Sequence, residues 1–386
     1  MPNKNLSKAK RAKNDEFYTQ YQDVEKEIMA YLDFDQDVFR GKTILLPCDD
    51  PEWSNFTKFF AQNFERFGLK KLISTSYAIE SKQYKGGYQL SVFEETSPKY
   101  DVSKTKVKGK IFTLTHDKSG DGKIDINDLE WEYLEGDGDF RSDEVKKLRD
   151  ESDIIITNPP FSLFRDFLAW IVEVDKKFVI IGSKNAITYK EVFPLIKENK
   201  MWVGTTSFNK DMLFISPEKI DPNNKPSTAT RTVDGVVYLR SPSVWYTNID
   251  HGRRHQPLPL MTMDDNIKFN KKMKGKNEYE EYENYSAIEV PFTNAIPSDY
   301  DKIMGVPISF LDKYSPEQFE ILGMCENEDL YDLKTKVYST DECKAAYLSK
   351  FGKKGTYDLN ASGVVLRNGL LEKVYQRVLI KHKNPS

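Results

Sequence analysis

Cysteine is scarce in this sequence of 386 residues, which contains only Cys48, Cys325 and Cys343. Three cysteines without CxxC or Cys/His spacing exclude a disulfide framework and a zinc site of the common types. The sequence also lacks any stretch near the roughly 18 apolar residues of a membrane span, and its polar N-terminus has no signal-peptide core. We therefore expect a soluble, cytoplasmic protein in a reducing compartment, with no membrane partner.

A strong net charge is missing as well, because 57 Lys and Arg residues oppose 60 Asp and Glu residues for a net charge of −3. The average conceals two basic blocks. Residues 1–14 have five basic residues and no acid, and residues 251–276 have seven basic against two acidic, so each block has a charge of +5. Such blocks favour contact with a polyanion, although a solvated tail and a solvated loop have the same composition. The candidate DNA contacts within them are Lys8, Lys10, Arg11, Lys13, Arg253 and Arg254.

The composition does not match that of a disordered chain, since hydrophobic residues make up 39% and aromatic residues 13% of the sequence. That content is enough for a packed core. The length suggests two or three units, or one large α/β domain with a smaller lobe.

Strand and helix patterns alternate in the N-terminal two thirds. They predict a helix over 15–32, a strand over 43–46, a helix that begins after Ser54 and ends at Gly68, and a strand over 71–77. The rhythm returns with a strand over 153–157, a helix over 163–174, a strand over 177–182 and a helix over 189–200. This β-α-β order predicts an α/β fold with a parallel sheet.

Two other regions break the alternation. Residues 86–135 read as a β-rich insertion without a clear helix, and the sequence past about 255 becomes irregular. In the latter, Ser315-Pro316-Glu317-Gln318 predicts a short helix, and Asn368-Gly369 predicts a hairpin whose second arm could also be helical. We expect a basic arm over 1–14, a catalytic domain over 15–255 and a C-terminal lobe over 256–386.

The most informative motif is Asn158-Pro159-Pro160-Phe161, directly after the apolar strand over 153–157. Two prolines fix the backbone and remove two donors, so the loop presents acceptors at the carboxyl edge of the sheet. The Asn158 side-chain oxygen and the Pro159 carbonyl suit the two hydrogens of an exocyclic amine, while Phe161 suits the face of a flat ring. Because these acceptors stabilise positive charge on the attacking nitrogen, no general base is required.

The motif is similar to the fourth motif of S-adenosylmethionine-dependent amino-methyltransferases. Further segments resemble the EcoRI-type adenine-specific DNA methyltransferases, and they follow one another in one order over more than 300 residues. They are DEFYTQYQDVEKEI (15–28), CDDPEWSNF (48–56), GLKKLI (68–73), GDGDFRSDE (136–144), TNPPFSLFRDFL (157–168), ITYKEVFPLIKENKMWVG (187–204) and IMGVPISFLDKYSPEQFE (303–320). This resemblance implies a Rossmann-like methyltransferase sheet and a C-terminal target-recognition lobe.

The resemblance also implies roles for individual residues. Phe17, Tyr18 and Thr19 correspond to the N-terminal cofactor motif. Asp49 and Asp50 stand where related enzymes have a glycine-rich turn, so we expect them to meet the ammonium group of S-adenosylmethionine. The remaining cofactor assignments are Asp139 and Phe140 for its adenine and Glu80 for its ribose hydroxyls, although a solvated Glu80 fits the sequence equally well.

An extruded base needs a second wall, and Tyr246 in the segment 244–248 is our candidate. The same sequence is compatible with an ordinary core strand in which Trp245 and Tyr246 are packed inside.

The segment 117–128 resembles a calcium loop, with oxygen side chains at positions 1, 3, 5, 9 and 12 and Gly122 at position 6. We expect a structural Ca²⁺ held by Asp117, Ser119, Asp121, Lys123 and Asp128, where Lys123 stands at the backbone-carbonyl position. A polar hairpin without metal is the alternative.

The expected activity is methyl transfer from S-adenosylmethionine to adenine N6 in double-stranded DNA, at a specific site and with base flipping. A cognate restriction endonuclease is an expected functional partner, whereas the recognised site and the oligomeric state do not follow from the sequence. Two alternatives remain. One is an amino-methyltransferase that acts on RNA or protein glutamine, and the other is a DNA-binding homologue without activity.

Overall fold

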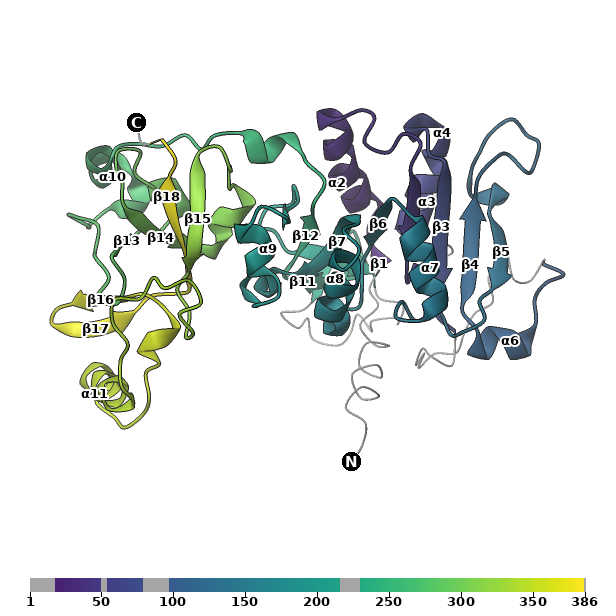
Figure 1. Cartoon of the computed structure of the whole chain (residues 1–386). Helices are drawn as coiled ribbons and strands as arrows, with labels where there is room; N and C mark the ends of the chain where they lie inside the picture. The colour runs from purple at the N-terminus through teal and green to yellow at the C-terminus, as the bar shows by residue number, and fades with distance from the viewer. Residues whose placement is uncertain (1–17, 50–53, 79–96, 216–229, 385–386) are drawn as a thin grey trace. The chain divides into compact units, whose positions relative to one another are not determined.

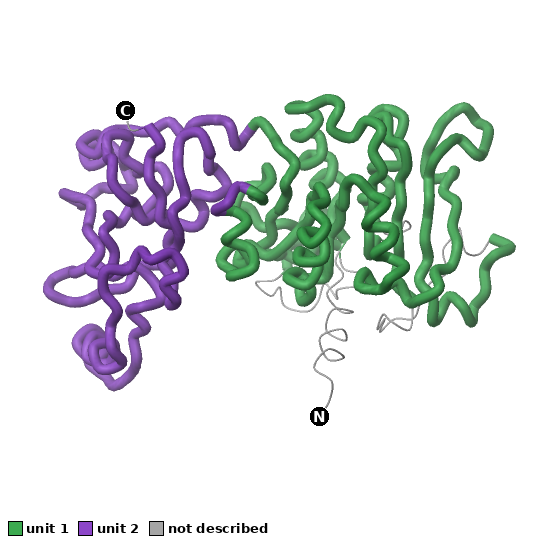
Figure 2. The backbone as a smooth tube through the Cα atoms, in the orientation of Figure 1, with its two compact units in different colours: residues 1–196, 200–252 green, residues 197–199, 253–386 purple. Residues whose placement is uncertain are grey.

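A computed structural model describes residues 18–49, 54–78, 97–215 and 230–384. The chain divides into two compact units (Figure 2). Unit 1 comprises residues 1–196 and 200–252, and unit 2 comprises residues 197–199 and 253–386. The division after residue 252 lies three residues before the position 255/256 that the sequence suggests. No helix in the described ranges is long and apolar enough to cross a membrane.

Unit 1 is built on a mixed sheet of eight strands in the order β5-β4-β3-β2-β6-β7-β12-β8. The strands are β2 (Thr43–Leu46), β3 (Lys71–Ser76), β4 (Lys110–Leu114), β5 (Glu130–Tyr133), β6 (Ile154–Thr157), β7 (Lys177–Ser183), β8 (Trp202–Val203) and β12 (Ser243–Thr247). The central four, β3, β2, β6 and β7, are parallel, and the outer strands pair antiparallel. Because β3 lies on one side of β2 and β6 on the other, the strand order reverses at β2.

Helices cover both faces of this sheet (Figure 1). One face packs against α2 (Tyr21–Phe34), α3 (Asn55–Gln62) and α4 (Phe64–Phe67), and the other carries α7 (Asp143–Glu151) and α8 (Phe164–Val172). Successive strand residues point to opposite faces, so Ile44 and Leu46 of β2 belong to the core beneath α2 and α3, while Leu45 is buried on the other side. All four residues of β2 and of β6 are buried, as expected for central parallel strands.

The helix predicted between Ser54 and Gly68 starts and stops at these residues, but Asn63 divides it into α3 and α4. The Ser54 hydroxyl accepts a hydrogen bond from the Phe56 amide at 3.1 Å, which makes Ser54 the N-cap. Five phenylalanines of this segment are buried in the core, namely Phe56, Phe59, Phe60, Phe64 and Phe67. Gly68 then closes α4 in the left-handed conformation, with φ of 63°.

The region 86–135 differs from the prediction in two ways. It contains a helix, α6 (Val102–Val107), which is capped by the Asp101 side chain. Its strands β4 and β5 also continue the main sheet at the β3 edge instead of forming a separate element. Other boundaries shift: the first helix begins at Tyr21 because strand β1 (Tyr18–Thr19) precedes it, and α9 is short, at Phe193–Lys197.

A second sheet of unit 1 has the order β1-β9-β11-β10. Its remaining strands are β9 (Met212–Ile215), β10 (Thr230–Val233) and β11 (Val236–Ser241), and every neighbouring pair is antiparallel. This sheet places the N-terminal segment next to β9, although nearly 200 residues separate the two in the chain.

Unit 2 contains a four-stranded sheet in the order β13-β14-β18-β15 and a two-stranded hairpin. Its elements are β13 (Ala287–Glu289), β14 (Ile303–Pro307), β15 (Phe319–Met324), β16 (Val364–Arg367), β17 (Leu370–Lys373), β18 (Arg377–His382), α10 (Met263–Phe269) and α11 (Thr340–Phe351). The hairpin prediction is confirmed for β16 and β17, because Asn368 and Gly369 have φ of 51° and 75°. The short helix predicted after Ser315 is wrong, since Pro316 to Gln318 form a turn that leads into β15.

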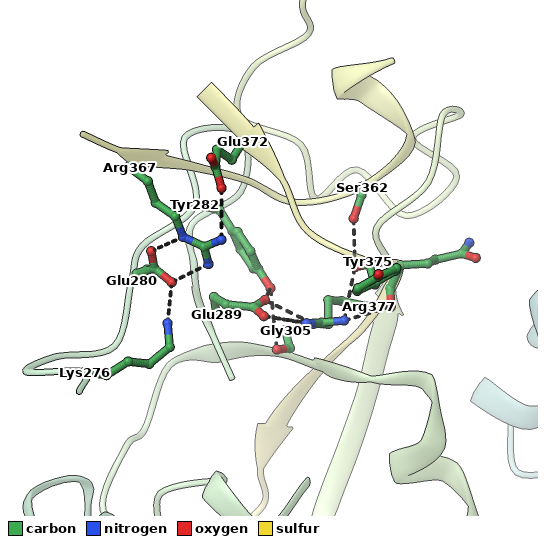
Figure 3. Close-up of polar contacts among 11 residues, drawn as sticks. Lys276, Glu280, Tyr282, Glu289, Gly305, Ser362, Arg367, Glu372, Tyr375 and Arg377 are labelled. Carbon is green, nitrogen blue, oxygen red and sulfur yellow. Dashed lines mark hydrogen bonds and ion pairs between the residues drawn. The ribbon is translucent and has the colours of Figure 1, made fainter. Parts of the chain in front are cut away.

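A buried ion pair lies in the core of unit 2 (Figure 3). The Arg377 guanidinium donates to Glu289 through Nη2 at 2.5 Å and through Nε at 3.1 Å, and the Tyr282 hydroxyl donates to the same carboxylate. A Cβ at Gly305 or Gly363 would overlap the Tyr282 ring, so both positions need glycine for close packing. The carboxylate is thus fully satisfied, as a buried charge requires.

The eight described 3₁₀ helices are short connections. They are η2 (Ile126–Asp128), η3 (Phe161–Leu163), η4 (Lys184–Thr188), η5 (Gly252–His255), η6 (Lys271–Met273), η7 (Thr293–Ala295), η8 (Ile308–Asp312) and η9 (Leu359–Ala361).

Candidate active site

The carboxyl ends of β2 and β6 lie side by side, and polar side chains meet there. The Thr157 hydroxyl oxygen lies 2.7 Å from the Pro47 carbonyl oxygen and 2.7 Å from Asp49 Oδ2. On the other side, the Ser54 hydroxyl donates to Asp49 Oδ1 at 2.9 Å. Both oxygens of the Asp49 carboxylate are therefore held by hydroxyl groups at the point where the strand order reverses. Open α/β sheets bind their ligands at such a position.

The turn after β2 has an unusual backbone. Cys48 has φ of 68°, in the left-handed region that favours glycine. Its amide donates to the Thr75 hydroxyl of β3 at 3.4 Å, and the Ser74 hydroxyl donates to the Asp49 carbonyl. The chain thus makes here, without glycine, the kind of tight turn for which related folds use a glycine-rich loop.

The tetrad Asn158-Pro159-Pro160-Phe161 follows directly on β6, as predicted. Both prolines are buried, whereas Asn158 and Phe161 are half-buried. The Pro160 carbonyl accepts from the Leu163 amide at 2.9 Å, which starts η3 and then α8. The Phe161 ring packs edge-on against Phe214 of β9, with 6.2 Å between the ring centroids. The motif is therefore fixed to β6 at one end and to α8 at the other.

The N-terminal motif lies against the start of α3. Thr19 pairs with Phe214 in the β1–β9 ladder, and its carbonyl accepts from the Asn55 side chain at 2.7 Å. Asn55 is the first residue of α3, next to the Ser54 that holds Asp49. These contacts bring Thr19, Asp49 and Phe161 together from three distant parts of the chain.

Asp139 belongs to a loop packed on the end of β3. A Cβ at Gly138, where φ is 87°, would overlap the Ser76 carbonyl, and the Ala78 amide donates to the Asp137 carbonyl at 2.9 Å. The Asp139 carboxylate receives Nε and Nη2 of Arg141 at 2.9 and 2.5 Å. This two-point pair orients Asp139 at the same carboxyl edge as Asp49, because β2 and β3 are parallel.

Two aromatic assignments do not agree with the structure. Phe140 is fully buried, and its ring packs edge-on against Phe167 and Trp170, so it is not placed to lie on a cofactor adenine. Tyr246 is also fully buried, in β12, where its hydroxyl donates to the Ser183 carbonyl at 2.8 Å and its ring packs on Phe164. Tyr246 is therefore the core residue of the alternative interpretation and not a wall for an extruded base.

The basic pair Arg253-Arg254 is engaged within unit 2. Arg254 is 6% exposed and its guanidinium donates to the Asn199 side chain, so it is not available to a phosphate. Arg253 is half-buried, and its Nη2 lies 3.5 Å from Asp312 Oδ2. The prediction of phosphate contact is thus wrong for Arg254 and is weakened for Arg253.

Seven of the other assigned residues lie outside the described residues, namely Phe17, Asp50, Glu80, Lys8, Lys10, Arg11 and Lys13.

The predicted calcium loop is closed by its own hydrogen bonds. Asp117 accepts from the amides of Gly120 and Gly122 at 2.6 and 2.8 Å, and Asp128 accepts from the amides of residues 118, 119 and 125 at 2.8–3.0 Å. Across the residues that the structure describes, no three His, Cys, Asp or Glu side chains form a group that could hold a metal. The described residues therefore give no support to a Ca²⁺ site at Asp117, Ser119, Asp121, Lys123 and Asp128.

Sequence reasoning missed the residues that hold the site together, namely Ser54, Asn55, Ser74, Thr157 and Phe214. The sequence predicts Ser54 only as a helix cap, yet the same hydroxyl also orients Asp49. The role of Thr157 can be predicted from the sequence, because a hydroxyl at the last position of a buried strand needs a hydrogen-bond partner. The role of Phe214 cannot, because its strand partner Thr19 lies far away in the sequence.

Comparison with known proteins agrees with this geometry. A family model described as "Adenine-specific methyltransferase EcoRI" matches residues 5–383. The chain is 41% identical over 333 residues to the Type II methyltransferase M.EcoRI of Escherichia coli, which covers 86% of this chain and 92% of that protein. It is 33% identical to the Type II methyltransferase M.MpnI of Mycoplasma pneumoniae and 32% identical to M.MgeORF184P of Mycoplasma genitalium, each over 86% of this chain and 90% of the relative. No solved structure matches. The match over nearly the whole chain confirms the resemblance in the sequence: the protein belongs to the EcoRI family of adenine-specific methyltransferases.

Proposed function

We propose that this protein transfers a methyl group from S-adenosylmethionine to the N6 amino group of an adenine flipped out of double-stranded DNA. One observation carries the proposal: Asn158-Pro159-Pro160-Phe161 follows β6 beside Asp49, at the point where the strand order of the sheet reverses. The relatives are named Type II methyltransferases, which supports action at a specific DNA site within a restriction-modification system. A cognate endonuclease that cuts the same site is part of this proposal.

The residues at the site fit S-adenosylmethionine. Thr19 Oγ1 is buried, and within the described ranges no residue gives it a hydrogen bond, so a polar ligand atom would satisfy it. The Asp49 carboxylate is held in place by Ser54 and Thr157 and suits an ammonium group. Asp139, oriented by Arg141, suits the amino group of an adenine ring. When bound, S-adenosylmethionine supplies an electrophilic methyl group.

The loop after β6 performs the transfer chemistry. The adenine amino group is a poor nucleophile because its lone pair is delocalised into the ring. Asn158 and the Pro159 carbonyl accept its two hydrogens and favour a pyramidal nitrogen, and they stabilise the positive charge that develops there. Phe161 holds the base face, and its own position is set by the Phe214 ring. The transfer would leave S-adenosylhomocysteine as the methyl group passes from sulfur to N6, and the surplus proton of the methylated nitrogen would then pass to water.

The two units have different roles in this proposal. Unit 1, with its parallel centre and helices on both faces, has a Rossmann-like methyltransferase layout and binds cofactor and target base. Unit 2 is the target-recognition lobe. The basic residues Lys8, Lys10, Arg11 and Lys13 contribute phosphate contacts, which hold the duplex without reading its sequence.

The test is methyl transfer from labelled S-adenosylmethionine to duplex DNA, RNA or protein. We expect label in DNA as N6-methyladenine, and its loss in Asn158→Ala. A matched control is Asn127→Ala, which removes an exposed amide from the 117–128 segment of unit 1 and leaves activity intact. Label in RNA or in protein glutamine would replace this proposal with the alternative acceptor. If no label is transferred to a DNA mixture that contains all short sites, the proposal fails, and the protein is the DNA-binding homologue without activity.

A further inference from the structure

A lysine-rich segment includes most of α11 and the residues that follow this helix in unit 2. Residues 343–357 contain Lys344, Lys350, Lys353 and Lys354 and no acidic residue, in a chain whose net charge is −3. The segment lies outside both basic blocks that the composition singles out. Lys353 and Lys354 are adjacent and stand between Gly352 and Gly355, and we call residues 352–355 the lysine loop.

Both glycines are needed for the shape of the lysine loop. Gly352 ends α11 in the left-handed conformation, with φ of 65°, and its amide donates to the Leu348 carbonyl at 2.8 Å. At Gly355 a Cβ would overlap the Tyr347 ring, so only glycine lets the chain return this close to the helix. The chain is thus folded back sharply, with the two lysines at the bend.

The two lysines of the bend differ from the others in the segment. Lys350 forms an ion pair with Glu372 at 3.0 Å, and Lys344 lies 3.5 Å from Asp341. Lys353 and Lys354 are exposed, and in the described part of the chain no carboxylate forms an ion pair with either. Their charges therefore face water unneutralised.

The base of the lysine loop is a cluster of aromatic rings. Tyr347 and Phe351 of α11 lie 4.6 Å apart between ring centroids, and Tyr357 packs edge-on against Phe351 at 5.9 Å. Lys350 and Lys373 lie over the Tyr357 ring at 5.5 and 5.7 Å. Packed rings of this kind restrict the motion of α11 and of the lysine loop against each other.

A chain of ion pairs fixes this end of unit 2 to its sheet. Glu372 of β17 receives Lys350 at 3.0 Å and Arg367 at 3.1 Å. Arg367 also forms a two-point pair with Glu280, which in turn receives Lys276 at 2.8 Å (Figure 3). Helix α11, the β16–β17 hairpin and the segment before β13 are therefore held together.

An ordinary structural role explains these lysines poorly. A lysine in the last turn of a helix favours the partial negative charge of the helix end, but that effect falls off within the turn. Lys353 and Lys354 lie beyond the cap residue Gly352, and Lys350 already occupies the last turn. The glycines instead fix a bend at which two positive charges are presented together.

We infer that the lysine loop contacts backbone phosphates of the DNA duplex, with Lys353 and Lys354 as its two contacts. The inference rests on the proposed function, because it assigns a surface of unit 2 to the same substrate. A lysine ammonium on a flexible stem is a point charge and lacks the planar fork of arginine, so these contacts hold the duplex without reading bases.

The test is the salt dependence of DNA binding by the full-length variant K353Q/K354Q. Each phosphate contact contributes about 0.9 to the slope of log K against log salt concentration, so the slope should become shallower by about 2. At about 0.1 M salt this corresponds to a loss of affinity of at least about tenfold. Because phosphate contacts carry no sequence information, duplexes with and without the recognised site should lose affinity by equal factors.

The matched control is K302Q/K383Q, which neutralises two exposed lysines of the same unit that lie outside both basic blocks and outside the lysine loop. An unchanged salt slope in K353Q/K354Q, or an equal change in the control, would overturn the assignment. Both variants alter only exposed side chains, so equal thermal unfolding confirms that the fold is intact. Methyl transfer by the wild type tests the proposed function separately. K353Q/K354Q should have the wild-type kcat, which is measured at saturating DNA. Its KM for DNA should be higher than that of the wild type.

Discussion

Cys48 holds a left-handed backbone conformation in the turn that carries Asp49. For a residue with a side chain this conformation is sterically unfavourable by about 1–2 kcal/mol. Glycine avoids that cost but loses about 0.5–1 kcal/mol more conformational entropy on folding. We therefore expect Cys48→Gly to leave the free energy of unfolding unchanged or to raise it by up to about 1 kcal/mol. Cys48→Val should lower it by about 1–2 kcal/mol, because a β-branched residue tolerates positive φ least. Urea unfolding followed by tryptophan fluorescence measures both, and a more stable valine variant would contradict the argument.

Thr157 positions Asp49 from the adjacent strand. Thr157→Val keeps the shape of the buried side chain but removes the hydroxyl that lies 2.7 Å from Asp49 Oδ2. A hydrogen bond to a charged group contributes about 1.5–3 kcal/mol of free energy, and without it the Asp49 carboxylate is held less firmly in the position that suits an ammonium group. We expect the Kd for S-adenosylmethionine to rise by about tenfold or more, with Thr157→Ser close to the wild type.

Calorimetric titration of the cofactor, without DNA, checks this positioning role. A Kd that does not change in Thr157→Val, in a protein of unchanged stability, would show that Asp49 does not meet the cofactor. The serine variant controls for packing, because it keeps the hydroxyl and loses only a methyl group.

The residues that the sequence predicts well are those whose neighbours along the chain determine their environment. Asn158 and its prolines follow an apolar strand, so their place at the sheet edge follows from local sequence. The sequence predicts ligand contacts for Phe140, Tyr246 and Arg254, yet all three side chains are buried. An aromatic or basic residue has the same local sequence signal in a core as at a binding site, because its burial depends on elements far away in the chain.

The same limit applies to whole elements. Ser54 and Gly68 predict the ends of the α3–α4 segment because the five phenylalanines between them recur with helical spacing. Ser315-Pro316 offers an equally good start, but the residues that follow alternate as Phe319, Ile321 and Gly323, which favours strand β15. Capping signals therefore predict a helix only where helical periodicity follows them.

The ion pairs around the β16–β17 hairpin predict a specific pH dependence. Arg367, and to a lesser extent Lys276, lower the pKa of Glu280 to about 2, well below its ordinary value. A carboxyl group with a lowered pKa stabilises the fold fully above its unfolded pKa, and that stabilisation is lost as the pH falls toward the folded pKa. Since Glu280 is partly exposed, we expect this contribution to be about 1–2 kcal/mol and to disappear between about pH 5 and pH 2.

Glu280→Gln isolates this contribution. Its free energy of unfolding should vary less steeply with pH than that of the wild type over the acid range, as measured by urea unfolding with far-UV circular dichroism. Glu278→Gln removes an exposed carboxyl two residues away and should retain the wild-type slope. Equal slopes in all three proteins would mean that the pairs with Arg367 and Lys276 add no stability to the folded unit.

Over the whole molecule, the position of charge matters more than its sum. The net charge of −3 does not indicate a DNA-binding protein. The basic block at 251–276 does indicate one, but some of the residues that it suggests as DNA contacts are buried. Arg254 lies inside unit 2, whereas the exposed pair Lys353 and Lys354 belongs to a segment that the charge pattern did not single out. Which charges face water depends on the packing of each unit.

The division into two units predicts where the cofactor acts. Thr19, Asp49, Asp139 and Asn158 all belong to unit 1, so S-adenosylmethionine should stabilise unit 1 and leave unit 2 unchanged. At a concentration of about 100 times its Kd, a ligand adds about 2.7 kcal/mol to the unit that binds it. Hydrogen exchange should then slow in β1, β2, α3 and β6, while exchange in β14 and β18 stays the same.

The tryptophans give an independent measure of the same effect. All five, at positions 53, 131, 170, 202 and 245, belong to unit 1, so their fluorescence reports the unfolding of that unit. Cofactor should shift this transition to higher urea concentration, and the shift should be smaller in Thr157→Val at the same cofactor concentration because its Kd is higher. If exchange in β14 and β18 slowed as much as in β2, cofactor binding would stabilise the chain as one cooperative body. Unit 2 would then be coupled to the cofactor site and not a lobe that binds DNA independently of it.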